Sequence, residues 1–265
     1  MKLNKIVILI LAVVIGTAMV GCGEKEKQKS GEKAEMKTYK VAMEPTFPPI
    51  DTTDKETGDL TGFDVDLMEA IAKDQGFKLK WENMSFAGLI PALEAGNVDI
   101  LASGMWASDE RKKKVDFSDT YYESGLVLAV ASTNNKVKSI DDLSTDMKVG
   151  GQIGTSGGDM AKKLKKENKI KDAKIYEGLD VAVMDLKNGV IDVLINDKPV
   201  SQEYVVKQKG KIKIVGDNLS EEDFGFAVQK GNKKLLNKIN KGLANVKKNG
   251  KYNKIYKKWF GEDPK

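Results

Sequence analysis

Apolar positions along residues 38–260 follow two spacings, one typical of helices and one typical of buried strands. Phe63, Leu67 and Ile71 recur every fourth residue and predict one face of a helix that Gly76 ends. Short apolar runs predict strands at 39–43, 78–81, 98–102, 126–131, 147–150, 174–176, 190–195 and 224–228. Further helices are expected through 91–95 and 182–187, from about Gly157, and along the tail 235–259. This alternation predicts an α/β fold in which helices cover mostly parallel sheets.

One phrase of the sequence occurs twice, 93 residues apart. LEAGNVDILASGMW (93–106) and LKNGVIDVLINDKP (186–199) each have a Leu, a Gly three positions later, an Asp six positions later and then an apolar pair. Either this is a common way to leave a helix and enter a strand, or the chain contains two similar α/β lobes. Two lobes would enclose a cleft at the carboxyl ends of their strands, where such sheets bind ligands. The residues at that edge are Ser103, Gly104, Met105 and Trp106 in the first copy, and Asn196 and Asp197 in the second.

Composition leaves room for two lobes and removes several kinds of catalytic site. The 265 residues are enough for two lobes of about 100 residues each. The 44 basic and 39 acidic residues are interspersed, which favours a solvated surface over a nucleic-acid partner. The absence of His excludes Ser-His-Asp catalysis and His-ligated metals, and a single Cys excludes a disulfide framework. The carboxylates do not cluster at a metal-ligand spacing, so neither a metal nor another cofactor is expected.

The amino terminus has the pattern of an export signal. Lys2 and Lys5 precede an uncharged apolar run at 6–20, which is short for a membrane span. The run ends at Cys22 and resembles a bacterial lipoprotein signal, although Met19 stands where such signals prefer Leu. The resemblance implies a signal peptide at 1–21, lipidation of Cys22, a disordered Lys/Glu-rich tether to residue 37, and a location on the outer face of the cell membrane. A plain signal peptide with an incidental Cys and an uncleaved anchor are the alternatives.

Two features of the sequence are suited to bind a carboxylate. Arg111 is the only Arg in a Lys-rich chain, and its planar fork donates two parallel N–H bonds to a carboxylate. It is otherwise an exposed helical Arg among lysines. The segment GQIGTSGGDM (151–160) predicts a strand-to-helix turn whose N–H groups attract an anion, without the GxxxxGK[ST] of an ATP-binding loop. Alternatively, Thr155 or Ser156 only caps the helix.

Other residues near the predicted cleft edges suit the rest of a small ligand. Asp197 and Glu44 come near or at the ends of predicted strands, where a carboxylate meets an ammonium group. Phe47, Phe86 and Trp106 are placed to stack on a ligand stem, although packing in the core explains each of them equally well. Together these residues match an amino acid, with its carboxylate, its ammonium group and its side chain.

Several long motifs, in order, resemble a known family. GFDVDLMEAIA, SFAGLIPALEAGNVDILASGMWASDERKKKVDFSDTYYESG, GTSGGDMAKKL, VLINDKP and YNKIYKKWFG are similar to family 3 of the bacterial extracellular solute-binding proteins, which serve polar amino-acid ABC transporters. The similarity covers residues 38–262. It implies a two-lobed periplasmic-binding-protein fold of type II with a double crossover. Lobe 1 would hold 38–124 and 226–265, lobe 2 would hold 127–222, and the hinge would lie near 123–125 and 223–225, where small residues absorb a rotation.

The resemblance also implies roles for the site residues. Arg111 and the backbone of Thr155 and Ser156 would hold the α-carboxylate, and Asp197 and the carbonyl of Gly104 the α-ammonium group. Phe47 and Phe86 would pack on the ligand, while Glu44 and Gln152 reach its side chain. Trp106 departs from the family, which usually has Ser or Thr there to touch the carboxylate, and it adds an aromatic wall or a cation–π partner.

The expected function is capture of a polar L-amino acid and its delivery to a membrane permease driven by a separate ATPase. Glu44 and Asp197 favour a cationic ligand such as Lys or Arg, whereas Gln152 and the aromatic residues suit Gln or another neutral amino acid. The protein is expected to be a monomer, with no catalytic residues and no enzyme activity. Two alternatives remain: a dehydratase of cyclohexadienyl acids with Glu44 as general acid, and a ligand-binding sensor or adhesin.

Overall fold

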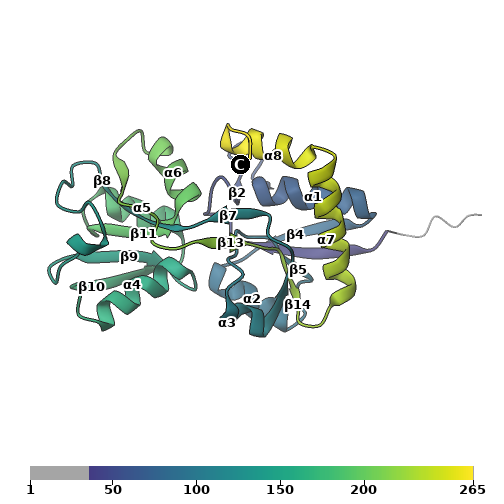
Figure 1. Ribbon diagram of the computed structural model, residues 1–265, viewed down its shortest axis with the longest axis horizontal. Coiled ribbons are helices and arrows are strands. Elements are labelled where there is room, and N and C mark those ends of the chain that lie inside the picture. Colours follow the sequence, from purple (N-terminus) through teal and green to yellow (C-terminus); the bar gives the residue numbers. More distant parts are fainter. Residues whose placement is uncertain (1–35, 265) are drawn as a thin grey trace, which may run out of the picture. The chain divides into compact units, whose positions relative to one another are not determined.

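Two five-stranded sheets with matching topology organise residues 36–264, the part of the chain that the computed structural model describes (Figure 1). The first sheet has the order β4-β1-β5-β14-β6 and the second the order β10-β9-β11-β8-β12. In each, the first three strands are parallel and the last two pairings are antiparallel. The first sheet contains β1 (Thr38–Met43), β4 (Lys78–Asn83), β5 (Ile100–Leu101), β6 (Val115–Phe117) and β14 (Ala227–Gln229). The second contains β8 (Leu126–Ala131), β9 (Lys148–Gln152), β10 (Asp172–Tyr176), β11 (Val193–Asp197) and β12 (Ile212–Val215).

The repeated phrase marks the central strand of each sheet. β5 and β11 occupy the third place in their sheets, next to the parallel strands β1 and β9 respectively. Each copy of the phrase therefore builds the same turn into the same strand of one lobe. The predicted two-lobed α/β fold is confirmed, and lobe 1 and lobe 2 denote here the first and second sheet with their helices.

Helices surround each sheet. Those of lobe 1 are α1 (Phe63–Gln75), α2 (Phe86–Glu94), α3 (Asp109–Lys114), α7 (Lys233–Lys248) and α8 (Lys251–Phe260). Those of lobe 2 are α4 (Ser156–Lys166), α5 (Leu179–Lys187), α6 (Lys198–Lys207) and the short 3-10 helix η1 (Ile140–Asp142). A small hairpin, β2 (Thr52–Thr53) with β3 (Leu60–Thr61), precedes α1. The tail predicted as helical is two helices, because Gly250 between them adopts a φ of 75°.

The chain crosses between the lobes along two short paired strands. β7 (Tyr122–Ser124) lies antiparallel to β13 (Glu222–Phe224), with Ser124 opposite Glu222. The prediction of one strand over 224–228 was wrong. Phe224 ends β13, and β14 begins at Ala227 in a different sheet. The chain between them therefore leaves one sheet and enters another.

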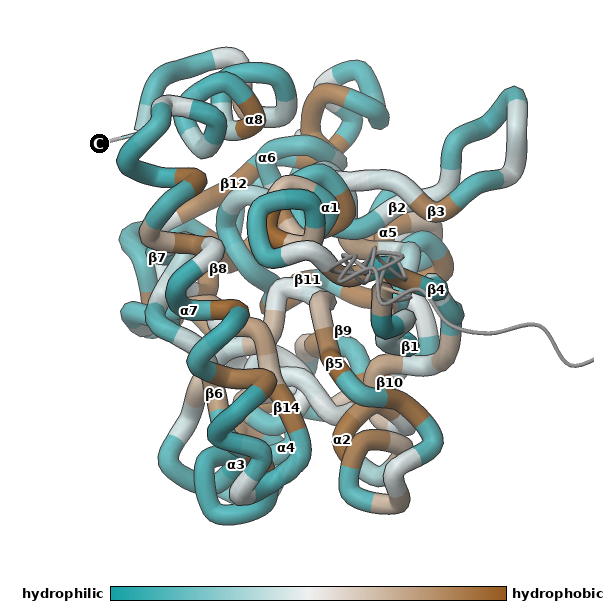
Figure 2. The backbone as a smooth tube through the Cα atoms, turned by 90° about the vertical axis from the view of Figure 1, so that its right-hand side faces the viewer, coloured by the Kyte–Doolittle hydropathy of each residue, from teal (hydrophilic) through white to brown (hydrophobic). Residues whose placement is uncertain are grey.

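Burial follows the predicted stripes. Leu236, Ile239, Leu243 and Val246 of α7 are all buried, and α7 packs on α1. Figure 2 shows polar and apolar residues alternating along α7. Gly242 permits the close approach, since a Cβ there would stand 2.7 Å from Cγ2 of Ile71.

We predict that Gly158→Ala destabilises lobe 2 by about 1–3 kcal/mol, because overpacking forces backbone shifts. A Cβ at Gly158 would stand 2.0 Å from the carbonyl oxygen of Gln152 on β9. Urea unfolding of the two proteins measures the difference. Gly88→Ala, in α2, is the matched helical control: its nearest neighbour is Oγ of Ser85 at 3.3 Å, and a gain of up to about 1 kcal/mol is expected. Equal stability of Gly158→Ala and the natural protein would contradict this packing argument.

Candidate functional site

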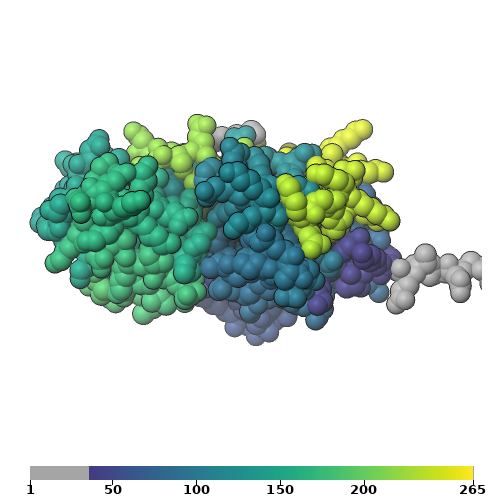
Figure 3. Space-filling model, turned by 90° about the horizontal axis from the view of Figure 1, so that it is seen from below, coloured from purple at the N-terminus to yellow at the C-terminus, as the bar shows by residue number. Residues whose placement is uncertain are grey.

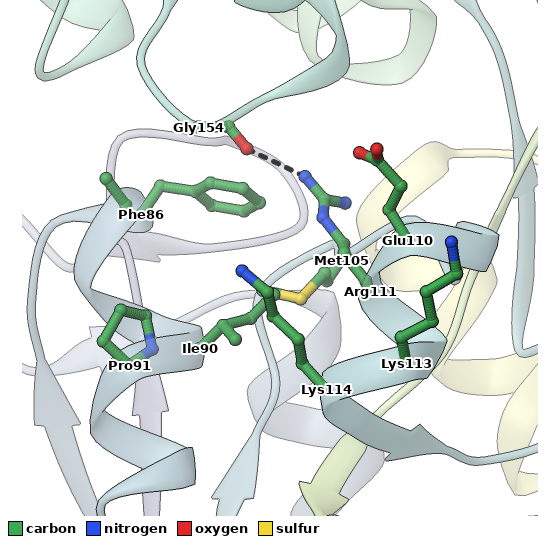
Figure 4. A pocket seen from close by; sticks show the side chains of 10 residues that line it. Phe86, Ile90, Pro91, Met105, Glu110, Arg111, Lys113, Lys114 and Gly154 are labelled. Atoms are coloured by element: carbon green, nitrogen blue, oxygen red, sulfur yellow. Dashed lines mark hydrogen bonds between the residues drawn. The ribbon is translucent and has the colours of Figure 1, made fainter.

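A short capped helix places Arg111 between the lobes. Ser108 caps α3, and its hydroxyl oxygen accepts the N–H of Arg111 at 3.3 Å. Nη1 of Arg111 donates to the carbonyl of Trp106 at 2.9 Å. Nη2 donates to the carbonyl of Gly154, also at 2.9 Å (Figure 4). Trp106 belongs to lobe 1 and Gly154 to lobe 2, so one side chain joins both. A guanidinium has five N–H donors, so three remain for other acceptors.

The surroundings of Arg111 are apolar on one side and acidic on another. Its guanidinium lies 5.4 Å from the ring centre of Phe86, in cation–π range. Burial lowers the pKa of Arg111, and the negative charges of Glu222 and Asp197 oppose that shift. The guanidinium remains charged at neutral pH, because its ordinary pKa lies so high.

The glycine-rich turn brings the amino terminus of α4 to the same place. Thr155 caps the helix: its Oγ1 accepts the N–H of Gly158 at 3.2 Å and donates to the carbonyl of Gln152 at 2.9 Å. A Cβ at Gly157 would stand 2.4 Å from the carbonyl oxygen of Ile195. The glycines therefore serve close packing, which sets the N–H groups of the first turn against the edge of the second sheet.

Two carboxylates face Arg111 across the cleft. Asp197 ends β11, is buried, and leaves Oδ1 without a hydrogen-bond partner among the described residues. Burial raises the pKa of Asp197 well above its ordinary value; the charge of Glu222 adds to the shift, and Arg111 opposes it. Burial also raises the pKa of Glu222, against hydrogen bonds from Ser156 (3.1 Å) and Ser220 (3.2 Å) and the charge of Arg111. One cation thus faces two acids at this point.

These groups line a small cavity between the lobes. Eight of the ten residues predicted to bind the ligand meet there: Phe47, Phe86, Gly104, Trp106, Arg111, Thr155, Ser156 and Asp197. Glu222 also lines it and was missed. No pattern in the sequence marks Glu222, because only the pairing of β13 with β7 brings it to the cleft.

Glu44 and Gln152, the other two predicted residues, lie outside that lining. Glu44 is buried; its Oε1 accepts the N–H of Thr46 at 3.2 Å and its Oε2 has no partner among the described residues. Burial raises the pKa of Glu44, and the polar groups of Thr46 and Gln152 oppose that shift. Nε2 of Gln152 donates to the carbonyl of Glu177 at 2.8 Å, and its Oε1 is buried without a partner. These two side chains form a second polar area in which acceptors lack donors.

Gly104 and Trp106 shape the wall that lobe 1 contributes. Gly104 has a φ of 47°, and a Cβ there would stand 2.9 Å from the ring of Phe47, so only glycine fits without strain. Its N–H donates to Oδ2 of the buried Asp64 at 2.9 Å. Trp106 forms an isolated bridge with Phe224 at the end of β13. The wall is therefore tied to the crossover strands.

Further contacts between the lobes were not predicted. Oγ1 of Thr46 accepts the N–H of Leu179 at 3.0 Å, and the hydroxyl of Tyr204 donates to the carbonyl of Thr46 at 3.0 Å. Thr46 follows β1, whereas Leu179 and Tyr204 belong to α5 and α6. Figure 3 shows the atoms of the two lobes in contact on the face of the molecule that is seen from below. The lobes thus close on each other beside the cavity.

A larger, open pocket of about 440 Å³ adjoins the cavity (Figure 4). Phe86 and Arg111 line both spaces, and Lys113, Lys114 and Glu110 line only the outer one.

Residues 36–264 contain no group of three or more acidic, Cys or His side chains placed to hold a metal ion. Within that part of the chain, no helix combines the length and apolar character needed to cross a membrane.

Comparison with known proteins gives consistent results. The family model described as bacterial extracellular solute-binding proteins, family 3, matches residues 39–262. A probable histidine-binding protein of Neisseria gonorrhoeae is 35% identical over 249 residues, covering 93% of this chain and 92% of that protein.

Solved structures agree in fold. An ancestral arginine-binding protein bound to arginine is 44% identical with a TM-score of 0.80, over 84% of this chain and 98% of that one. An ancestral amino-acid-binding protein described as a precursor of cyclohexadienyl dehydratase is 38% identical with a TM-score of 0.77, over 84% and 95% of the two chains.

We predict that Asp197→Asn raises the free energy of unfolding of the ligand-free protein by about 1–3 kcal/mol near pH 7, because it removes a buried, incompletely paired charge. The folded-state pKa of Asp197 is raised, so the folded state binds more protons than the unfolded chain above about pH 4. The contribution of Asp197 to the free energy of unfolding therefore falls as the pH rises from about 4 through the pKa of the folded state.

Urea unfolding at about pH 4 and about pH 7 measures this difference. The variant should show a smaller loss of stability between the two conditions than the natural protein. Asp217→Asn, at an exposed carboxylate, is the control and should change little. An unchanged pH dependence in Asp197→Asn would show that this carboxylate is not the source of the loss.

Proposed function

The chain belongs to family 3 of the bacterial extracellular solute-binding proteins, and we propose that it captures a polar L-amino acid for a membrane ABC permease driven by a separate ATPase. The single observation that carries this proposal is the cavity in which Arg111 and the start of α4 face Asp197. A cation with helix N–H groups on one side and a carboxylate on the other is complementary to a zwitterion.

Each end of an amino acid finds a partner in this arrangement. The unused N–H donors of Arg111 and the backbone N–H groups at Thr155 and Ser156 are suited to the α-carboxylate. The unpartnered Oδ1 of Asp197 and the carbonyl of Gly104 are suited to the α-ammonium group. Phe47, Phe86 and Trp106 supply apolar walls that exclude water and strengthen these interactions.

The unpaired acceptors favour a cationic side chain. Oε2 of Glu44 and Oε1 of Gln152 are both buried without a donor among the described residues. An orphaned buried acceptor costs free energy, and a donor-rich guanidinium or ammonium group removes that cost. The proteins named above for histidine and arginine fit the same chemistry. We therefore propose a cationic amino acid, with arginine as the first candidate.

Closure of the lobes is the proposed capture step. The hinge would lie at 123–125 and 223–225, on β7 and β13, between a lobe of 38–124 with 226–265 and a lobe of 127–222. Thr46, Arg111 and their partners then hold the closed form. Gly125 lies at this crossing, and the close packing there requires a glycine, because a Cβ would stand 2.2 Å from the carbonyl oxygen of Ser220.

Attachment to the membrane is proposed from the sequence alone. Cys22 and its tether lie outside the described residues. Lipidation of Cys22 would keep a monomeric binding protein on the extracytoplasmic face of the membrane, beside the permease.

An enzyme remains the second candidate. The relationship to a precursor of cyclohexadienyl dehydratase shows that this fold has led to catalysis. Here the buried Glu44, with its raised pKa, would be the general acid. Turnover of a cyclohexadienyl acid by the natural protein, and its loss in Glu44→Gln, would favour this alternative. A third candidate, a sensor or adhesin, would bind the ligand without supporting transport.

Thermal unfolding of the protein against the twenty L-amino acids identifies the ligand. At about 1,000 times its dissociation constant, a ligand adds about 4 kcal/mol to stability, and about 2–4 °C of shift is expected per kcal/mol. We predict that Arg111→Ala then weakens binding of that amino acid by about 2–5 kcal/mol, because the carboxylate loses its buried cation.

Calorimetric titration compares Arg111→Ala with Lys113→Ala, a neighbouring cation that lines only the outer pocket and should bind nearly as well as the natural protein. Full retention of affinity in Arg111→Ala would refute the assigned carboxylate site.

A second substitution tests the side chain of the ligand. We predict that Glu44→Gln weakens arginine and lysine binding by about 1.5–3 kcal/mol, the value of a hydrogen bond to a charged group, and changes glutamine binding much less. Glu82→Gln, on the neighbouring strand β4, is the control. An equal loss for all three amino acids would place Glu44 at the α-amino end of the ligand instead.

A further inference from the structure

Charge is distributed very unevenly along the described chain. Residues 36–229 contain 26 basic and 33 acidic side chains, whereas residues 230–260 contain eleven Lys and neither Asp nor Glu. Those lysines belong to α7, α8 and the turn before α7. The acidic majority of the domain therefore carries a strongly cationic face at one end of lobe 1, called here the α7–α8 face.

Helical spacing gathers four of the lysines on one side of α7. Lys234, Lys238, Lys241 and Lys248 are separated by four, three and seven residues, so they project in similar directions. The buried apolar stripe described above occupies the opposite side of the helix. Lys234, Lys241 and Lys248 are exposed and Lys238 is half-buried. The ammonium groups thus form a row that faces away from the core.

Most carboxylates near this face pair with lysines outside the row of four on α7. Lys230 and Lys233 pair with Asp116, and Lys258 pairs with Asp66. Asp74 on α1 interacts with Lys241 and Lys251 at longer range. Among the described residues, no carboxylate lies within 4.0 Å of any of the four α7 lysines. Their charge is left for an external partner.

The place of this face within the domain separates it from the cavity. Figure 2 looks at the end of lobe 1, with α7, α8 and α1 nearest the viewer and lobe 2 behind. In Figure 1 the described chain begins at this same end, where β1 starts. The cavity lies between the lobes, so a partner on this face leaves the ligand site free.

We propose that the α7–α8 face docks the domain on an anionic phospholipid surface. The partner is a charged surface rather than a folded protein or a nucleic acid, because this row carries single point charges without the planar forks of Arg or exposed aromatic side chains. Each lysine held near an anionic membrane strengthens binding several-fold, within about one Debye length. The described chain begins at this same end of lobe 1.

The experiment uses residues 36–265, which form a compact unit separate from 1–35 and correspond to nearly the whole of the solved arginine-binding relative. Sedimentation with vesicles of phosphatidylglycerol and phosphatidylcholine, in about 0.1 M salt, is compared with vesicles of phosphatidylcholine alone. Binding is expected only to the anionic vesicles and is expected to disappear at about 1 M salt. Absence of binding to anionic vesicles, or equal binding to neutral ones, would overturn the proposal.

Matched variants locate the surface. Changing Lys234, Lys238, Lys241 and Lys248 together to Gln should weaken vesicle binding at least tenfold, and changing the same four to Arg should preserve it. Changing Lys162, Lys163, Lys165 and Lys166 on α4 to Gln removes the same charge from exposed positions of lobe 2 and should leave binding nearly intact. Urea unfolding verifies that each variant is folded. Equal losses in the α7 and α4 variants would mean that binding follows net charge and not this face.

Discussion

The hydrogen bond from the guanidinium of Arg111 to the carbonyl of Gly154 joins the two lobes at the point where the ligand is expected to bind. It uses one donor of five, and the bond to Trp106 uses another. The remaining donors lie in a small space that also contains Asp197 and Glu222. In such surroundings an unbalanced charge is costly, and the raised pKa values of both carboxyl groups express that cost. The arrangement is most stable when a molecule with complementary charges completes it.

The duplicated strand order explains why this site lies between two lobes and not within one. β5 and β11 are equivalent strands, and each delivers its following residues to the cleft. Lobe 1 contributes Gly104, Trp106 and, within the short helix α3, Arg111; lobe 2 contributes Asp197 and the capped start of α4. The double crossover then adds Glu222 from a strand that belongs to neither main sheet. In the proposed binding mode each end of a zwitterion contacts both lobes, so binding would favour closure.

Sequence patterns were sufficient for most strands of the two sheets, for most helices and for the family, because local spacing and long ordered motifs carry that information. The edge strands β6 and β12 were not predicted. The strand predicted across 224–228 failed because its apolar run hides a change of sheet, which no local pattern records. Glu222 and the Thr46 contacts were missed for a related reason: they depend on pairing between residues about 100 or more positions apart. Lipidation of Cys22 stays a prediction, since its segment lies outside the described residues.

The cleft and the far end of lobe 1 differ in the sign of their charged side chains. Near the cleft, the buried acids Glu44, Asp197 and Glu222 outnumber the half-buried cation Arg111, which favours a cationic ligand. At the far end, eleven lysines stand without an acidic residue in the same segment of sequence. Fields of opposite sign at opposite ends give the domain a direction in any external field. A domain that is cationic toward an anionic membrane and acidic toward its cleft would be oriented before it meets a partner. That orientation would follow from the acidic residues at the cleft together with the lysines of the α7–α8 face.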